Sequence, residues 1–184
     1  MSEPCSFFLR ASIEKAQYLK FMQAKPSQPL VNDNWLEWWN SREMCNKSEL
    51  NQTIKAWDSA SNQDIVNGWL AAKNTLAFSE FDEAKNTWAF GIIMCSENYS
   101  EILPLLVFCE SISPYKLCAS HDFAIIYPYL WGDDHVMAYM TFAQEGALLS
   151  RAKSVTDIAK NHLETAASQL GEKWKAFEAK MNDD

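Results

Sequence analysis

The strongest periodic pattern in the chain lies near its C-terminal end. Hydrophobic residues recur there at intervals of three and four, the spacing of one face of an α-helix. They are Val155, Ile158, Ala159, Leu163, Ala166, Leu170, Trp174, Phe177 and Met181. Ser154 and Asp157 match a capping box, in which two side chains accept hydrogen bonds from free N–H groups at a helix start. The pattern predicts a long helix over residues 154–181 that lies across one face of a sheet.

A period of two replaces this spacing in the middle of the chain. Residues 75–81 and 87–95 alternate between apolar and other side chains on either side of a polar stretch, which predicts a β-hairpin. Ala89 and Gly91 lie on the opposite face from the large side chains of the second strand. Because they are small, we expect that face to admit a helix at close range.

A second pair of alternating segments follows, over residues 122–131 and 136–142. Gly132-Asp133-Asp134 separates them and is typical of a turn. Proline has no N–H to donate to a neighbouring strand. Pro128 therefore predicts an edge position or a bulge for the first of these strands.

The N-terminal part combines one strand with several helices. Residues 6–11 predict a strand, and we expect Ser12 to cap the helix that follows. Residues 30–72 predict a helical subregion with a stripe of tryptophans on one helix face. The stripe consists of Trp35, Trp38 and Trp39. The stripe is most simply part of the core. The alternative is a platform on which sugars or bases stack. Nucleic-acid platforms normally include basic residues, however, and these are missing here.

Together these elements predict an α+β fold in one domain over residues 1–184. An antiparallel sheet of about five strands, within residues 74–150, packs in two layers against the long C-terminal helix. A composition of 48% hydrophobic and 22% charged residues excludes global disorder. No apolar run reaches the roughly 20 residues that a membrane span needs. The first residues also lack the layout of a secretion signal, so we expect a cytoplasmic protein.

The acidic excess is confined to the middle of the chain. The protein has 24 Asp and Glu against 16 Lys and Arg, a net charge of −8. Residues 61–150 hold 11 of the acids and only 3 of the bases. Such a field repels phosphate backbones and anionic membranes, so neither is an expected direct partner. It favours a basic protein partner, or simply maintains solubility.

Motifs for common cofactors and reactions are missing. Phosphate-binding loops need closely spaced glycines, and no two glycines here lie within ten residues of each other. The sequence therefore predicts no nucleotide cofactor. The compact spacing of Cys118 and His121, with Cys109 and with His135 or Asp122, is the best partial metal-ligand set. A loop histidine and core cysteines explain the same residues, and we predict no metal.

Two catalytic arrangements remain as hypotheses. A nucleophilic thiol from Cys95 or Cys118, paired with His121 or His135, is disfavoured because the acidic surroundings oppose thiolate formation. Carboxylates near Asp133 and Asp134, with Glu97 or Glu101, suggest a small hydrolase. Gly-Asp-Asp is also ordinary turn chemistry. We therefore expect a protein that is not an enzyme.

The predicted binding surface combines acids with aromatic residues near strand ends. Its residues are Asp82, Glu83, Glu97, Tyr129, Trp131, Asp133, Asp134 and Glu145. The acids would steer association, and the aromatic residues would anchor the complex. Compact acidic proteins without catalytic motifs resemble, as a class, bacterial immunity proteins, which neutralise a toxin by covering a basic active site. This analogy implies an inhibitor of a basic toxin or nuclease domain; a nucleic-acid mimic that inhibits a DNA-binding enzyme is the alternative.

Overall fold

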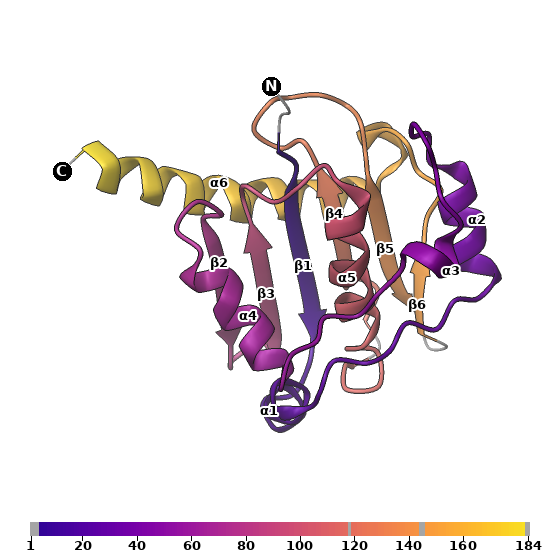
Figure 1. Ribbon diagram of the computed structural model, residues 1–184. Coiled ribbons are helices and arrows are strands. Elements are labelled where there is room, and N and C mark those ends of the chain that lie inside the picture. The colour runs from indigo at the N-terminus through magenta and orange to yellow at the C-terminus, as the bar shows by residue number, and fades with distance from the viewer. Residues whose placement is uncertain (1–3, 118, 144–145, 183–184) are drawn as a thin grey trace.

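The computed structural model describes residues 4–117, 119–143 and 146–182, and for residues 181 and 182 it describes the backbone alone. At its centre is an antiparallel sheet with the strand order β2-β3-β1-β4-β5-β6 (Figure 1). The strands are β1 Ser6–Ser12, β2 Ala77–Asp82, β3 Thr87–Ile92, β4 Phe123–Tyr127, β5 Ala138–Ala143 and β6 Gly146–Leu149. The predicted antiparallel sheet is confirmed, with six strands rather than about five.

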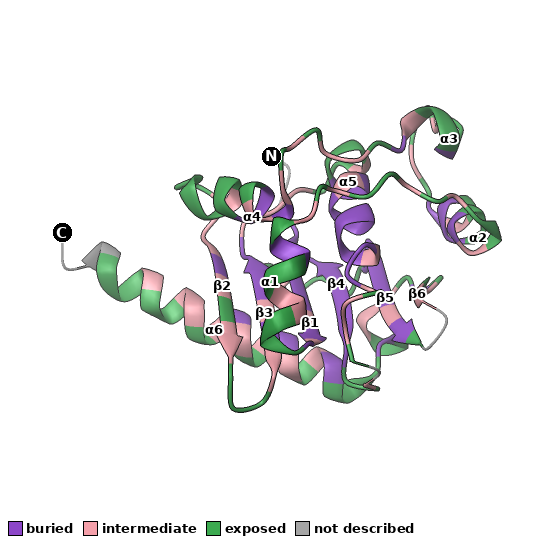
Figure 2. Cartoon of the chain, turned by 90° about the horizontal axis from the view of Figure 1, so that it is seen from below, coloured by how far each residue is buried: buried purple, intermediate pink, exposed green. Residues whose placement is uncertain are grey.

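Helices cover both faces of this sheet. Five of them, α1 to α5, lie on one face, and α6 crosses the other (Figures 1 and 2). They are α1 Lys15–Gln23, α2 Asp33–Ser41, α3 Leu50–Thr53, α4 Asn62–Ala71, α5 Tyr99–Glu110 and α6 Lys160–Asn182. The α+β class and the long C-terminal helix are thus confirmed. The sequence pattern predicted a sheet and one layer of helix, whereas helices cover both faces of the sheet.

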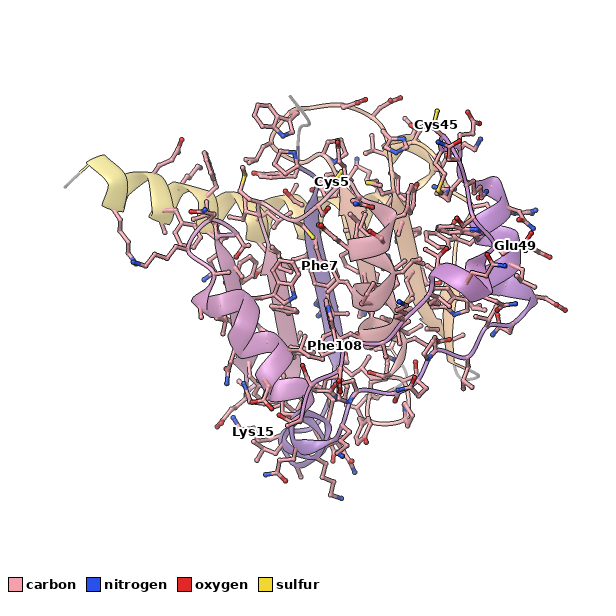
Figure 3. All side chains as sticks on the ribbon, in the orientation of Figure 1. Cys5, Phe7, Lys15, Cys45, Glu49 and Phe108 are labelled. Atoms are coloured by element: carbon pink, nitrogen blue, oxygen red, sulfur yellow. The ribbon has the colours of Figure 1, made fainter. Side chains whose placement is uncertain are left out.

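The larger hydrophobic core lies between the sheet and helices α1 to α5. Phe7 of β1 and Phe108 of α5 both belong to it (Figure 3), and the rings of both pack against Phe90 of β3. The tryptophans of α2 belong to the same core, with exposed fractions of 1%, 0% and 3% for Trp35, Trp38 and Trp39. The Asn32 side chain caps α2 by accepting a hydrogen bond from the Trp35 backbone N–H. The tryptophan stripe is therefore core, which excludes its use as an open stacking platform.

A second core lies between the sheet and α6. Phe8 and Phe123 contribute from the strands, and Ala166 and Leu170 are fully buried on the helix. Alternation along each strand explains the two cores, because neighbouring side chains point to opposite faces. No helix in the described part of the chain is long and apolar enough to cross a membrane.

The C-terminal helix starts later than its sequence pattern predicts. Ser154 and Asp157 do form the predicted capping box, but it caps the single 3₁₀ turn Val155–Asp157. The backbone then extends at Ile158, and α6 begins at Lys160. Local capping chemistry was thus predicted correctly, whereas the break between turn and helix was not.

The predicted edge position of the strand before Pro128 is wrong. β4 pairs with β1 on one side and with β5 on the other, so it is an inner strand. It ends at Tyr127, which places the proline just beyond the ladder, where its missing N–H costs no hydrogen bond. Tyr129 and Trp131 consequently lie in the following turn and not in the strand.

Ser12 does not cap α1 as predicted. It is the last residue of β1, and both its backbone N–H and its hydroxyl donate to Oδ1 of Asp122, each over 2.8 Å. On the small face of β3, helix α6 lies near Ala89 as expected, whereas the ring of Phe78 on β2 covers Gly91. The carboxylate that binds Ser12 lies 110 residues away in the sequence.

Candidate functional site

The acids predicted to form one surface lie at opposite ends of the sheet. Asp82 ends β2 and is aligned through Thr87 with Ser12, the C-terminal end of β1. The segments that carry Glu97 and Asp133 follow β3 and β4, whose last residues align with the N-terminal end of β1. Glu83 follows Asp82 and lies at the same end of the sheet. Trp131 and Asp134 belong to the segment that carries Asp133, at the opposite end (Figure 1). Glu145 lies outside the described residues.

The acids of the β2–β3 hairpin are neutralised within the chain. Asp82 pairs with Lys85 at 3.1 Å, and Glu83 pairs with Lys15 at 3.0 Å. Hydrogen bonds from Lys85 lower the pKa of Asp82. These exposed pairs stabilise the fold little, but each of the two carboxylates already has a lysine partner.

At the opposite end, carboxylates from three distant segments converge on one cleft. Glu43 follows α2, Glu97 lies between β3 and α5, and Asp133 follows β4. They line a cleft of about 350 Å³ together with Cys5 and His135. We name this feature the acidic cleft. Cys5 immediately precedes β1, at the N-terminal end of this central strand (Figure 3).

Buried Arg42 fixes one wall of the acidic cleft. It is only 3% exposed. Nη1 donates to the carbonyl of Val136 over 2.9 Å, and Nη2 donates to that of Arg151 over 2.8 Å. The guanidinium therefore joins the segment that carries Glu43 to two segments about 100 residues further along the chain. Sequence reasoning missed this residue because its acceptors are backbone carbonyls, which carry no residue-specific signal.

The turn that carries Asp133 is held from the other side by the segment before α6. Val155 N–H donates to the carbonyl of Asp134 over 2.7 Å, and Val136 N–H donates to that of Lys153 over 2.8 Å. The Ser154 hydroxyl also donates to the Asp134 carboxylate over 3.4 Å. These hydrogen bonds hold the segment that carries Asp133 in place, and they orient the Asp134 carboxylate toward Ser154.

The charges of the cleft act on the thiol of Cys5. Burial, together with the negative charges of Glu97 and Asp133, raises the pKa of Cys5 to about 12. Lys153 donates a hydrogen bond to Glu43 over 2.7 Å, which lowers the pKa of that carboxyl. Within the described residues, neither Glu97 nor Asp133 has an ion-pair partner. Two carboxylates of the cleft are therefore uncompensated.

The two predicted aromatic anchors differ in their surroundings. Trp131 is 50% exposed, and its indole N–H donates to the carbonyl of Pro4 over 3.2 Å, next to Cys5 of the cleft. Tyr129 instead packs beside Gly171 of α6 and is only half-buried there. Trp131 therefore lies beside the acidic cleft, whereas Tyr129 faces the helix.

Burial opposes an ionised thiol at two of the candidate cysteines, Cys95 and Cys109. Cys109 is fully buried, and burial raises its pKa. Burial likewise raises the pKa of Cys95 to about 12, which opposes a nucleophilic thiolate. His121 is exposed, and Cys118 lies outside the described residues. Across the described part of the chain, no three His, Cys, Asp or Glu side chains gather as metal ligands.

One carboxyl that sequence reasoning did not select has a raised pKa. Glu110, at the end of α5, is half-buried, and this burial raises its pKa although the indole N–H of Trp35 donates to it over 3.1 Å. It lines a separate cavity of about 320 Å³ with Val107 and Pro114. Glu110, the carboxyl whose pKa is raised, therefore does not line the acidic cleft.

Comparisons with protein-family models, with curated proteins and with solved structures find no match to this chain. The function must therefore be argued from the site alone.

Proposed function

We propose that the protein binds a basic protein partner through the acidic cleft. The observation that carries this proposal is the convergence of Glu43, Glu97 and Asp133 on one concavity, with two of the three lacking a cation among the described residues. Like charges held together repel one another, so the unbound state has an electrostatic cost that a cationic partner relieves. Lysine or arginine side chains of the partner would supply that charge.

The neighbouring features agree with a protein partner. Exposed Trp131 offers a large apolar surface beside the charges, the type of residue that dominates binding energy at interfaces. The cleft walls are braced by Arg42 and by the 153–155 segment, so little order would have to be gained on binding. On these grounds we propose an immunity- or antitoxin-type inhibitor, whose partner is a basic toxin or nuclease domain.

A matched pair of double variants tests the site. E97Q with D133N removes two charges from the cleft, and D82N with E83Q removes two charges from the opposite end of the sheet. The partner is first captured from source-cell lysate on the immobilised protein, eluted with salt and purified. We expect its Kd, measured by calorimetry, to rise at least tenfold for the cleft variant and to stay within twofold for the control.

Two further measurements make the proposal falsifiable. Steered association should weaken as salt rises, because the Debye length falls to about 8 Å at physiological ionic strength. Equal losses for both double variants would show that net charge, and not the cleft, is recognised. If the lysate supplies no partner, a deca-arginine peptide serves as the probe, and equal affinity for wild type and the cleft variant then refutes the site.

The captured partner also separates the inhibitor classes. An immunity-type inhibitor should abolish the toxic or nuclease activity of the purified partner at a one-to-one ratio. A nucleic-acid mimic should instead compete with DNA for a DNA-binding enzyme. A partner that retains full activity in the complex contradicts both.

A small hydrolase is the second candidate, because the carboxylates near Asp133 line a concave site. A general acid at neutral pH needs a raised pKa, yet the pKa of Glu43 is lowered. Hydrolysis of model glycosides that is lost in D133N would favour this candidate over the binder.

A further inference from the structure

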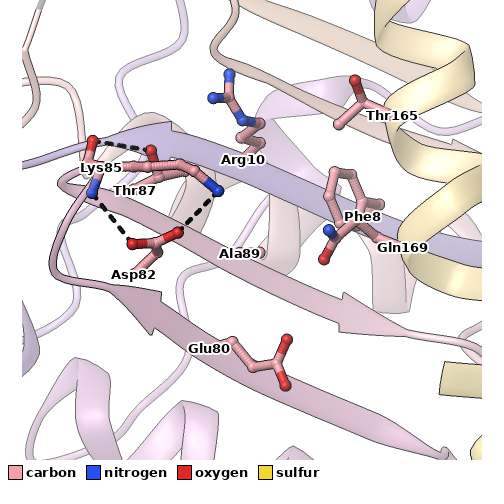
Figure 4. Close-up of a pocket in the computed structure, with 9 residues that line it drawn as sticks. All are labelled: Phe8, Arg10, Glu80, Asp82, Lys85, Thr87, Ala89, Thr165 and Gln169. Atoms are coloured by element: carbon pink, nitrogen blue, oxygen red, sulfur yellow. Dashed lines mark hydrogen bonds and ion pairs between the residues drawn. The ribbon is translucent and has the colours of Figure 1, made fainter. Parts of the chain in front are cut away.

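A further hollow, on the opposite face of the sheet from α1 to α5, contains an arginine that has no carboxylate partner among the described residues. It has a volume of about 210 Å³ and lies between strands β1 to β3 and helix α6 (Figure 4). Its lining residues are Phe8, Arg10, Glu80, Asp82, Lys85, Thr87, Ala89, Thr165 and Gln169. None of these residues lines the acidic cleft.

The hollow exists because a small residue separates two long ones in one row of the sheet. Glu80 of β2, Ala89 of β3 and Arg10 of β1 are direct cross-strand neighbours. Facing side chains of this kind lie about 5 Å apart, so a methyl group between two long side chains leaves space above it. Phe8, two residues before Arg10 on the same face, closes one side of the space.

The acids at the rim of the hollow are already paired with lysines. Asp82 binds Lys85 through the ion pair drawn in Figure 4, and Glu80 pairs with Lys173 of α6. Each pair is neutral as a unit. Among the described residues of the lining, Arg10 is therefore the cation that has no acidic partner.

Most of the hydrogen-bonding capacity of Arg10 is unused by the described residues. A guanidinium carries five N–H donors in a planar fork. One nitrogen, Nη1, donates to the carbonyl of His121 over 3.0 Å, and within the described ranges no carboxylate lies within ion-pair distance of this side chain. Thr87, Thr165 and Gln169 add neutral hydroxyl and amide groups around the same space.

We propose that this hollow binds a small molecule through an oxyanion, a carboxylate or phosphate group held by the Arg10 fork. Planar guanidinium groups match both anions through paired N–H donors. The volume is below the roughly 300 Å³ at which pockets for drug-sized ligands begin, so the hollow takes a headgroup or a small metabolite. In a chain of net charge −8, this is a site for the opposite charge from that of the acidic cleft.

The experiment titrates the full-length protein with inorganic phosphate and, separately, with succinate, at an ionic strength fixed with sodium chloride. Calorimetry gives the affinity, and the Arg10 Nε–H signal in ¹⁵N NMR spectra gives the location. We expect saturable millimolar binding of at least one anion, with a shift of that signal. The anion that binds more tightly assigns the headgroup as phosphate or carboxylate.

Three variants distinguish a built site from general charge. R10Q removes the fork, and R151Q removes an equal charge from an exposed arginine. A89V fills the hollow with a residue suited to a strand and leaves Arg10 in place, so it remains informative if R10Q folds poorly. We expect at least tenfold weaker binding for R10Q and for A89V, and no change for R151Q.

Absence of binding to either anion at tens of millimolar overturns the proposal. So does equal binding by wild type and A89V, which would place the anion elsewhere on the surface. Neither result bears on the acidic cleft, because the two sites share no residue.

Discussion

The neighbours of the buried residue His162 determine which of its ring nitrogens carries the proton. It is 6% exposed, and its ring stacks on Phe123 with the centroids 4.3 Å apart. Nε2 lies 3.1 Å from the carbonyl of Ser120, which can only accept, so Nε2 carries the proton. Nδ1 then accepts from the hydroxyl of Tyr139 over 2.8 Å. The surroundings therefore select one neutral tautomer.

This environment predicts an acid-sensitive contribution to stability. Burial lowers the pKa of His162, and His121 and Arg10 lower it further, while the Ser120 carbonyl and Asp122 oppose the shift. Between the lowered folded pKa and the unfolded value near 6.5, the unfolded chain binds more protons. Stability is thus fully present above about pH 6.5 and falls as the pH drops, by at most about 1.4 kcal/mol per unit.

Urea unfolding between pH 5 and 7.5 measures this effect. The variant H162Q should unfold more easily at pH 7 but show a shallower loss of stability on acidification than wild type. H135Q, which replaces an exposed histidine, should retain the wild-type slope. Identical slopes for wild type and H162Q would show that the pKa of His162 does not differ between the folded and unfolded states, which contradicts the predicted contribution.

At the scale of single elements, the environment of a glycine decides what the residue does. In β3, Gly91 lies under the ring of Phe78, its direct cross-strand partner. Lys173 of α6 covers that ring, with Nζ 5.5 Å from its centroid. In α4, by contrast, Gly68 has nothing within 4 Å of the position that a Cβ would occupy.

The same substitution should therefore have opposite signs at the two positions. G91A forces the buried Phe78 ring to move, and overpacking of this type costs about 1–3 kcal/mol. G68A removes the backbone freedom of glycine from a helix interior and should stabilise the protein by about 0.5–1 kcal/mol. Chemical denaturation of both variants checks this pair, and a stabilised G91A would contradict the packing of Phe78 on β3.

At the scale of the whole molecule, the central strand connects segments that are far apart in sequence. β1 pairs with β3, about 80 residues later, and with β4, about 115 residues later. It makes no ladder with β2, the next strand in the chain. Both cores also depend on this arrangement, because β1 contributes Phe7 to one core and Phe8 to the other.

A chain that ends at residue 117 should consequently fail to fold cooperatively. It lacks β4 to β6 and α6, so β1 becomes an edge strand and the face that carries Phe8 loses its cover. We expect no sigmoidal thermal transition by circular dichroism. A chain that ends at residue 178, which loses only the last part of α6, is the control and should unfold cooperatively. A cooperative transition in the shorter chain would mean that the first three strands form an independent unit.

The candidate sites show the same division between local and distant information. The sequence predicted Glu97, Trp131 and Asp133 as members of one surface, and they do lie in or beside one cleft, because acids and aromatic residues near strand ends are recognisable locally. It could not place Asp82 and Glu83 at the other end of the sheet, since that depends on strand order. It also gave no indication of Glu43, which lines the cleft from a region about 90 residues before Asp133, or of the neighbouring Arg42, which holds the Val136 carbonyl.

Periodicity, turn residues and capping residues act between neighbours in the chain, so the sequence by itself determined the α+β class, the antiparallel hairpins, the tryptophan core and the long last helix. Tertiary structure alone decided which acids share a cleft, that Lys15 and Lys173 pair with Glu83 and Glu80, and that Arg10 borders a hollow made by Ala89. Those outcomes depend on strand order and cross-strand register. Both are set by packing between residues that are distant in sequence, and no local pattern records them.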